Sequence, residues 1–495
     1  MADIQLVDVS LRDGNQSLWG AVGLDTGRIL RIAPILDRIG FHALDYTSST
    51  HMGMAVRTHR EDPWERIRLT HQAMPHTPLQ FIGTGFRFIS WETAHPEVMQ
   101  LVYDRLVVNG ISRFVVLDPM HDMDAARASA RMLRLAGATE IVGALVFTVS
   151  DVHDDDHYGA LAAQLAACPD IDRVYIKDPG GLLTSERAAA LVPAVLARLG
   201  GKPLELHSHC TIGLPGRSYL TAADLGVQAL QTACGALSEG SSLPDAQRTA
   251  ANLRALGHTV DIDDRLLGAA ATYFDRMAAA EGLPAGRPQA FDAAFLRHQL
   301  AGGAMATMRR QLAELGLSNR FDAVVEEVTR VRADLGHPIM VTPFPQMVSS
   351  QALYNIIGGE RYAQVSDQVI RYTLGAFGRP VTPIDPEVAD RILDRPRAKE
   401  IAQEPPPADI AELRRRFSRG ISDEELLLRA TMPAEQVDAM IAAGPARRHY
   451  NPGLSPVLEL LRGLADRPPL PELLLQNPDF RLELRRDHRR AGTQA

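Results

Sequence analysis

The sequence predicts an α/β fold: a closed (β/α)8 barrel of the TIM type in the first 260 residues, followed by a helical extension. Eight short apolar runs are typical of strands, they recur about every 30 residues, and each precedes a stretch with helical apolar periodicity. The runs are residues 4–9, 42–46, 79–84, 113–117, 140–147, 173–176, 203–207 and 227–232. Helical periodicity is clearest at residues 27–39, 96–109, 123–136 and 185–199.

The predicted strands have the composition of a parallel sheet that is buried on both faces. Runs such as FVVL (114–117) and LVFTV (145–149) are almost continuously apolar. Eight successive βα units predict a closed barrel, in which functional side chains lie at the C-terminal ends of the strands. A doubly wound open sheet is the alternative, but no Gly-x-Gly-x-x-Gly motif follows the first strand to support it.

The character of the chain changes after residue 260, where helical patterns replace strand-like runs. A proline-rich break, EPPP at 404–407, precedes a last helical region and a polar tail. We therefore expect a barrel domain at 1–260, a helical extension at 261–403 and a C-terminal helical segment at 404–495. The helices of the second part are expected at residues 264–281, 305–315, 322–335, 349–357 and 366–374.

The composition is that of a soluble globular protein, with 45% hydrophobic and 23% charged residues. The net charge of −8 argues against a general nucleic-acid surface. The N-terminus shows neither a secretory signal nor a membrane span, so we expect a cytoplasmic protein. The three cysteines lack zinc-finger spacing. Of the 52 basic residues only three are lysines, so each lysine is a candidate for a specific role.

The first candidate site motif is LRDGNQS (11–17), directly after the first predicted strand. It offers the guanidinium of Arg12, the carboxylate of Asp13 and the amide of Gln16 at the mouth of the barrel. A polar turn with an Asp-Gly break is the alternative interpretation.

The second motif is HSHC (207–210), at the end of the seventh predicted strand. Side chains two residues apart on a strand face the same way, so His207 and His209 point together. Two such imidazoles are typical ligands of Zn, Co or Mn. A hydrogen-bonded pair of histidines without a metal is the alternative.

The third motif is YIKDPGG (175–181), which places Lys177 at the end of an apolar strand. Burial lowers the pKa of an amine, and a neutral amine reacts with CO₂ to give an anionic carbamate. Lys177 would then join Asp13, His207 and His209 as a metal ligand, because the ends of strands one, six and seven meet at one mouth. A Lys177–Asp178 ion pair is the alternative.

With these motifs the chain resembles the biotin-dependent carboxyltransferases. That family includes the keto-acid subunit of transcarboxylase, the α subunit of oxaloacetate decarboxylase and the carboxyltransferase domain of pyruvate carboxylase. The matching stretches keep their order over most of the first 390 residues. They are LRDGNQSLWG (11–20), EDPWERIR (61–68), IKDPGGLLT (176–184), HSHCTIGL (207–214), VTPFPQMVSSQALYN (341–355), GERYAQVSDQV (359–369) and GRPVTPIDPEV (378–388).

The resemblance implies a barrel with a helical funnel behind it and a divalent metal, either Zn, Co or Mn. It implies that Arg12 and Gln16 act at the substrate and that Lys177 belongs to the catalytic set. In such an enzyme the metal polarises a keto-acid oxygen and stabilises an enolate, which attacks carboxybiotin. Decarboxylation of oxaloacetate is the same step reversed. The implied metal ligands are Asp13, carbamylated Lys177, His207 and His209.

Three segments depart from the family pattern. The hydroxyl that shuttles a proton to biotin falls on Ala306, and Thr307 is displaced by one position, a turn of about 100° on a helix. The family's keto-acid-binding arginine aligns with Thr84, and Arg87 is the candidate replacement. At the end of the second strand, TSSTHMGM (47–54) replaces GGATFD. We therefore take Arg87 and Thr307 as candidate substrate-binding residues beside Arg12 and Gln16.

The source of biotin is also indicated by the sequence. A biotinylated lysine lies next to methionine, and none of Lys177, Lys202 and Lys399 has a methionine neighbour. We therefore expect biotin on a separate biotin carboxyl carrier protein, with a biotin carboxylase subunit as a further partner. The resemblance also suggests a homodimer.

Two other functions are weighed against a carboxyltransferase or decarboxylase of pyruvate- or oxaloacetate-like acids. A biotin-independent, metal-dependent C–C lyase or aldolase shares the Asp and the His-x-His motif, and the lost hydroxyl favours it. Lys177 argues against it, because the related metallolyases do not generally carry that lysine ligand. A non-catalytic scaffold subunit is the third hypothesis, and retention of all the candidate ligands argues against it.

Overall fold

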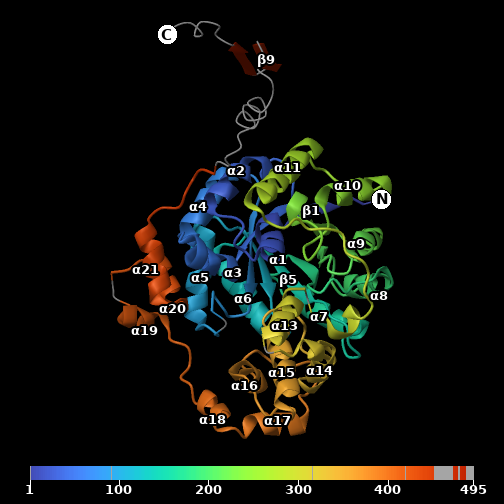
Figure 1. Cartoon of the computed structure of the whole chain (residues 1–495), viewed down its shortest axis with the longest axis vertical. Helices are drawn as coiled ribbons and strands as arrows, with labels where there is room; N and C mark the ends of the chain where they lie inside the picture. Colours follow the sequence, from blue (N-terminus) through green and yellow to red (C-terminus); the bar gives the residue numbers. More distant parts are fainter. Residues whose placement is uncertain are drawn as a thin grey trace, which may run out of the picture. The chain divides into compact units, whose positions relative to one another are not determined.

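The computed structural model describes residues 2–90, 92–300, 302–314, 316–417, 420–450, 472–477 and 480–485. Its centre is a closed barrel in which parallel strands β1 to β8 pair in sequence order and β8 pairs with β1 (Figure 1). The predicted (β/α)8 fold is thereby confirmed. The strands are β1 (Gln5–Asp8), β2 (Ala43–Ser48), β3 (Leu79–Thr84), β4 (Arg113–Leu117), β5 (Glu140–Val146), β6 (Arg173–Asp178), β7 (Leu204–Ser208) and β8 (Ala229–Thr232).

Helices surround the barrel (Figure 1). They are α1 (Asn15–Trp19), α2 (Thr26–Leu36), α3 (Ser49–Met54), α4 (Pro63–Ala73), α5 (Pro96–Val108), α6 (Met123–Ala136), α7 (Asp155–Ala166), α8 (Ser185–Leu196), α9 (Pro215–Asp224), α10 (Ala246–Ala255) and α11 (Asp264–Glu281). Short turns of helix interrupt the loops: the π-helical η1 (Ser10–Gly14) and η2 (Ala55–His59) and the 3₁₀ turn η3 (Gly235–Leu237).

Local sequence signals explain where these helices begin and end, and α6 is an example. The carboxylate of Asp122 accepts hydrogen bonds from the amides of Asp124 (3.1 Å) and Ala125 (3.0 Å) and so caps the helix. Gly137 ends it with a φ of 100°, in the left-handed region that glycine enters without a Cβ clash. The buried face, which includes Ala126 and Leu133, recurs at helical spacing and packs toward the barrel strands.

A polar network fills the N-terminal end of the barrel interior. The fully buried Arg113 guanidinium forms ion pairs with Glu140 (2.5 Å) and Glu205 and donates to Gln80 Oε1. The Nε atom of Arg173 lies 2.7 Å from Glu205 Oε1. Buried charges are tolerated only when they are paired. Because the partners lie on different strands, these contacts link the N-terminal ends of β3 to β7.

The helical extension packs around a second core and covers the mouth of the barrel. Ile339 joins a cluster with Ile82, Leu117 and Tyr175 at the C-terminal ends of the strands, with Val341 packed against it. The extension consists of α12 (Phe295–His298), α13 (Gly302–Glu314), η4 (Ser318–Arg320), α14 (Phe321–Asp334), α15 (Phe344–Gly358), α16 (Asp367–Thr373), α17 (Pro386–Leu393) and α18 (Pro396–Ala402).

The last helices, α19 (Ile410–Phe417), α20 (Asp423–Thr431) and α21 (Ala434–Ala443), return to the outside of the barrel. Glu424 accepts from Arg68 (3.0 Å) on α4 and from Asn109 (2.7 Å) after α5. Residues Met1–Arg448 form one compact unit, so the predicted boundaries at 260 and 403 fall within it and stay predictions. Among the described residues, no helix is long and apolar enough to cross a membrane.

The second unit, His449–Ala495, departs from the predicted helical segment at 404–495. Its described residues form an antiparallel pair of strands, β9 (Glu472–Asn477) and β10 (Phe480–Arg485), with Phe480 opposite Asn477. The physical reason lies in FRLELR, where apolar and polar residues alternate with the period of a strand. The prediction of a helical segment with a polar tail overlooked that alternation in the described part.

Two histidines near the C-terminal end of β5, the half-buried His121 and the buried His153, make the fold sensitive to acid. His121 accepts a hydrogen bond from the amide of Val146 through Nε2 (2.8 Å), and His153 Nδ1 lies 2.7 Å from Ser150 Oγ. Burial, with a further effect of His157, lowers the pKa of His121 to about 3. Burial and the neighbouring His157 lower the pKa of His153 to about 2. Both imidazoles are therefore neutral in the folded protein at neutral pH.

We expect the free energy of unfolding to fall as the pH is lowered from about 7 to about 5, because these histidines bind protons in the unfolded protein but stay neutral in the folded protein. Below the pKa of an unfolded histidine, about 6.5, each of the two residues lowers the free energy of unfolding by about 1.4 kcal/mol per pH unit. Urea unfolding at the two pH values measures this. In His121→Gln, which keeps an acceptor for Val146, the acid-dependent loss should shrink by about 2 kcal/mol. An unchanged pH dependence in this variant would contradict the assignment to His121.

Candidate metal centre and active site

Asp13 lies in η1 directly after β1, and buried hydrogen bonds hold this turn. Ser10 donates its amide to Asp8 Oδ1 (3.1 Å) and its hydroxyl to Asp8 Oδ2 (2.7 Å). The amide of Cys234, after β8, donates to Ser10 Oγ (2.8 Å), and Ser17 donates its hydroxyl to Asp13 Oδ1 (2.9 Å). The Asp13 carboxylate is thereby fixed at the C-terminal end of β1.

Lys177 and His207 are direct partners in the register of β6 and β7, and His209 follows β7. Asp178 does not pair with Lys177. Its carboxylate accepts from Ser208 Oγ (2.6 Å) and from the amides of the loop after β6, while its carbonyl accepts from the His209 amide (3.1 Å). The Lys177–Asp178 ion pair that the sequence left open is therefore replaced by a contact between Lys177 and Asp13.

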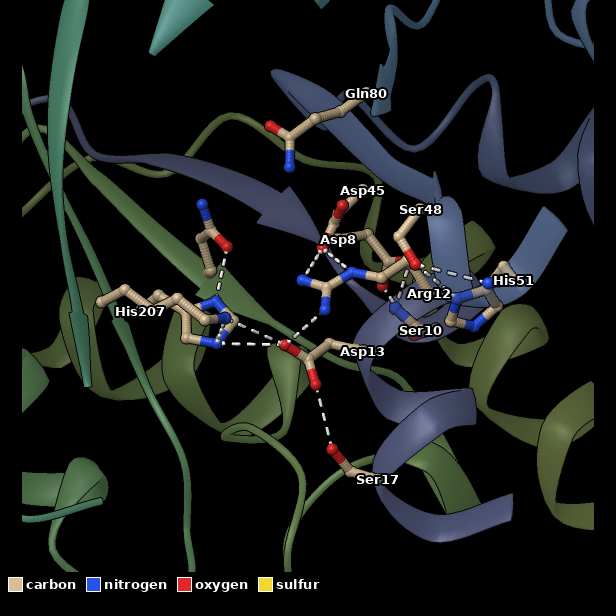
Figure 2. Close-up of polar contacts among 12 residues, drawn as sticks. Asp8, Ser10, Arg12, Asp13, Ser17, Asp45, Ser48, His51, Gln80 and His207 are labelled. Atoms are coloured by element: carbon tan, nitrogen blue, oxygen red, sulfur yellow. Dashed lines mark hydrogen bonds and ion pairs between the residues drawn. The ribbon is translucent and has the colours of Figure 1, made fainter. Parts of the chain in front are cut away.

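The four predicted ligands converge at one point. Asp13 Oδ2 lies 3.2 Å from His207 Nε2, 3.5 Å from His209 Nε2 and 3.3 Å from Lys177 Nζ. His207 Nε2 is 3.1 Å from His209 Nε2 and 2.9 Å from Lys177 Nζ. Figure 2 shows the His207 ring and the Asp13 carboxylate facing each other, with Arg12 alongside. All four side chains are buried.

The outer nitrogens of the two imidazoles determine what the inner nitrogens offer. His209 Nδ1 lies 2.7 Å from the Ser241 carbonyl oxygen, and His207 Nδ1 lies 2.7 Å from Gln231 Oε1. Both oxygens are acceptors, so both Nδ1 atoms carry the proton of a neutral ring and both Nε2 atoms present lone pairs. Two neutral rings in this state cannot donate to each other. A divalent cation satisfies these lone pairs together with Asp13 Oδ2.

The charges around the centre favour ligation. Burial opposes ionisation of Asp13, but the positive charges of Arg12 and Lys177 hold the pKa of its carboxyl well below its usual range. Burial and the adjacent Lys177 lower the pKa of His207 to about 3, so that ring stays neutral. Burial also lowers the pKa of Lys177, although Asp13 partly opposes this effect. Within the described residues, Asp13, His207 and His209 are the group of acidic, His or Cys side chains that is close enough to share one ion.

Arg12 is held between two acids. Its Nε donates to Asp45 Oδ2 (2.7 Å), its Nη2 contacts the same oxygen, and its Nη1 lies 2.9 Å from Asp13 Oδ2. Sequence reasoning missed Asp45, which is fully buried on β2. The available signal was an acid within the run predicted as a strand at 42–46, where burial requires a partner.

We expect Asp45→Asn to weaken metal retention about 10- to 100-fold, the usual effect of removing a partner that orients a ligand. The neutral amide no longer balances the charge of Arg12. The guanidinium then pairs with Asp13 alone and competes with the metal for its carboxylate. Equilibrium dialysis against a divalent metal buffer measures the change. Asp62→Asn provides a matched control, because Asp62 caps α4 through the Trp64 amide (2.9 Å) and is not among the residues that line the cavity over the centre. Equal metal affinity in Asp45→Asn and wild type would contradict this role.

A cavity of about 680 Å³ opens over the centre. Gln16 and Arg87 line it together with Thr84, and the segment 340–346 of the extension forms another wall. Arg87 is also tied to the extension, since its Nη2 donates to the Ala376 carbonyl (2.9 Å) and its guanidinium stacks on Phe377. The side chain of the remaining predicted contact, Thr307 in α13, lies outside the described residues.

The segment that departs from the family pattern at the end of β2 forms a polar wall of this cavity. Ser48, Ser49 and Thr50 line it, followed by Met54 and Arg57. Behind them Ser48 Oγ lies 3.0 Å from Nδ1 of the buried His51 (Figure 2).

Comparisons with known proteins agree with this architecture. Residues 295–443 match a family model described as a conserved carboxylase domain. The chain is 32% identical over 392 residues to a pyruvate carboxylase subunit of Methanocaldococcus jannaschii, covering 79% of this chain and 68% of that protein. It is 29% identical over 459 residues to the 2-oxoglutarate carboxylase large subunit of Hydrogenobacter thermophilus, covering 91% and 70%.

The fold is also that of a solved carboxyltransferase domain. The structure of this domain from Rhizobium etli pyruvate carboxylase with pyruvate superposes with a TM-score of 0.79 at 22% identity, covering 98% of this chain and 83% of that one. The resemblance inferred from the sequence motifs is confirmed. The chain belongs to the biotin-dependent carboxyltransferases, the enzyme family that includes the pyruvate carboxylase subunit of Methanocaldococcus jannaschii.

Proposed function

We propose that this enzyme transfers a carboxyl group between carboxybiotin and a small keto acid of the pyruvate or oxaloacetate type. The observation that carries this proposal is the convergence of Asp13 Oδ2, His207 Nε2 and His209 Nε2, all within 3.5 Å of one another, beneath a cavity of about 680 Å³. The relatives support it, since their names specify pyruvate and 2-oxoglutarate, both keto acids.

The metal proposed here is a divalent ion such as Zn, Co or Mn, held by Asp13, His207 and His209. When bound, such an ion polarises a substrate oxygen and stabilises the negative charge of an enolate. Lys177 as an ammonium would add a positive charge beside the ion. We therefore infer that its neutral amine adds to the carbon of CO₂ and releases a proton, and that the resulting carbamate supplies the fourth ligand.

Arg12 and Gln16 are the proposed substrate contacts. A guanidinium has five N–H groups, and three of those of Arg12 face Asp45 and Asp13. The others remain to bind a keto-acid carboxylate in the cavity that Arg12 lines. Gln16 lines the same cavity and offers an amide to the keto oxygen. Arg87 stays a proposed contact at the cavity wall, and so does Thr307.

Biotin is proposed to arrive on a carrier protein that a biotin carboxylase subunit loads, as the naming of the relatives as subunits suggests. Thr431 of α20 lines the cavity, and we infer that the C-terminal helices border the entrance for the carrier. A homodimer is part of the same proposal, and light scattering of the purified chain tests it.

Isotope exchange tests the proposed reaction. Purified enzyme is incubated with ¹⁴C-labelled oxaloacetate or other keto acids, with and without free biotin, and transfer or release of the label is followed. We expect turnover that depends on biotin and on a divalent metal. Turnover of a keto acid that is independent of biotin would instead identify a C–C lyase or aldolase and overturn the proposed function. The same panel identifies the preferred keto acid.

A further inference from the structure

A buried chain of hydrogen bonds connects the polar network at the base of the barrel to His207. Glu205 lies two residues before His207 on β7, and Gln231 lies on the adjacent strand β8. Gln231 Nε2 donates to Glu205 Oε2 (3.3 Å), and Gln231 Oε1 lies 2.7 Å from His207 Nδ1. The exposed fraction of each of these side chains is 1% or less.

The chain of hydrogen bonds has a fixed donor-to-acceptor direction, because Glu205 at its end only accepts hydrogen bonds. Glu205 Oε1 is paired with the guanidinium groups of Arg113 and Arg173, so Glu205 is a carboxylate and can only accept from Gln231. The NH₂ group of Gln231 therefore faces Glu205, and its oxygen faces His207. Since that oxygen must receive a hydrogen, Nδ1 of His207 is protonated and Nε2 presents its lone pair to Asp13.

The tautomer of His209 does not depend on a side-chain amide. His209 Nδ1 faces the backbone carbonyl of Ser241 at 2.7 Å, and a backbone carbonyl cannot exchange its acceptor for a donor. A glutamine side chain can, because rotating its amide by about 180° exchanges NH₂ and oxygen. His207 would then receive a hydrogen at Nδ1, carry its own proton on Nε2 and direct that proton at Asp13.

We propose that Glu205 and Gln231 are positioning residues that lock His207 in the Nδ1–H tautomer and so keep its Nε2 available to a metal ion. This proposal rests on the proposed role of His207 as a metal ligand. Neither residue faces the cavity over the centre, so both act through the imidazole rather than on the substrate. The Tyr175 ring packs edge-on against His207, with centroids 6.0 Å apart, and leaves the tautomer to the polar chain.

Cobalt binding to the purified enzyme tests the lock, followed by the visible absorption of Co²⁺ during titration. Glu205→Gln removes the obligate acceptor and is expected to weaken Co²⁺ binding about 10- to 100-fold. The charge swap Glu205→Gln with Gln231→Glu restores a carboxylate acceptor directly at His207 Nδ1, and Co²⁺ affinity should recover relative to Glu205→Gln. Thr232→Val is the matched control on β8. Thr232 is also fully buried, but as the next residue after Gln231 it points to the opposite face of the strand.

Histidine-selective ¹⁵N NMR of the metal-free wild type provides a second measurement that needs no destabilising variant. The His207 signal, identified by its loss in His207→Asn, should show the Nδ1–H tautomer. An Nε2–H signal, or unchanged Co²⁺ affinity in Glu205→Gln, would overturn the lock while leaving the metal centre intact. Failure of the wild type to bind Co²⁺ would overturn the proposed function and the lock together.

Discussion

Replacing Asp13 by asparagine is expected to lower the rate of carboxyl transfer by at least about 10³-fold, because metal stabilisation of transition-state charge is worth several kcal/mol. The change keeps the shape of the side chain but removes the anion that faces Arg12, Lys177 and both imidazoles. The Arg12 guanidinium would then adjoin the ion without a balancing carboxylate from residue 13. Steady-state rates, together with metal content by mass spectrometry, measure the effect.

Asp124→Asn is the matched control, since Asp124 undergoes the same chemical change on the surface, where its side chain is 91% exposed. It should keep full activity and metal content. If Asp13→Asn retained the metal and most of the activity, the proposed centre would be wrong, whereas loss in both variants would indicate a general effect on the fold.

Replacing Arg113 by methionine is expected to lower the free energy of unfolding by about 3–5 kcal/mol, the usual result of breaking a buried ion pair. The substitution leaves Glu205 paired with Arg173 alone and removes a partner of Glu140 and Gln80. Coulombic attraction to Glu205 and Glu140 outweighs burial and raises the pKa of Arg113, so its charge stabilises the native state. Urea unfolding of the metal-free protein measures the loss.

Arg68→Met provides the comparison for this experiment. Arg68 also pairs with a glutamate, Glu424 at 3.0 Å, but its side chain is 41% exposed. Solvent screens such a pair, so the expected loss is below about 1 kcal/mol. Equal effects of the two substitutions would show that the barrel interior does not depend on its buried charges.

Much of the fold follows from periodicity. The bounds of β3 and β4 match the predicted runs, because their ends coincide with polar or turn residues. β6 continues past the predicted end at residue 176 and includes Lys177 and Asp178. An apolar pattern stops at the first charge, whereas the strand continues because buried partners satisfy these charged groups.

The candidate ligands could be recognised from sequence because each belongs to a short motif at a strand end. The roles of Asp45 and Gln231 could not be assigned in this way, because their partners lie in other elements. The partner of Asp45 is Arg12 in η1, and the partners of Gln231 lie on β7. Their roles depend on which way the side chain faces and on the register between neighbours, information that a single strand does not contain. Arg87, a predicted substrate contact, lines the cavity, but its contact with Ala376 depends on how the helical extension packs.

Anomalous diffraction from crystals of the metal-loaded enzyme, grown with bicarbonate, tests the central claim most directly. We expect one strong anomalous peak within bonding distance of Asp13 Oδ2, His207 Nε2 and His209 Nε2, with electron density extending from Lys177 Nζ to the same ion. A peak elsewhere, or an ion bound beside an unmodified Lys177 amine, would contradict the four-ligand centre proposed here.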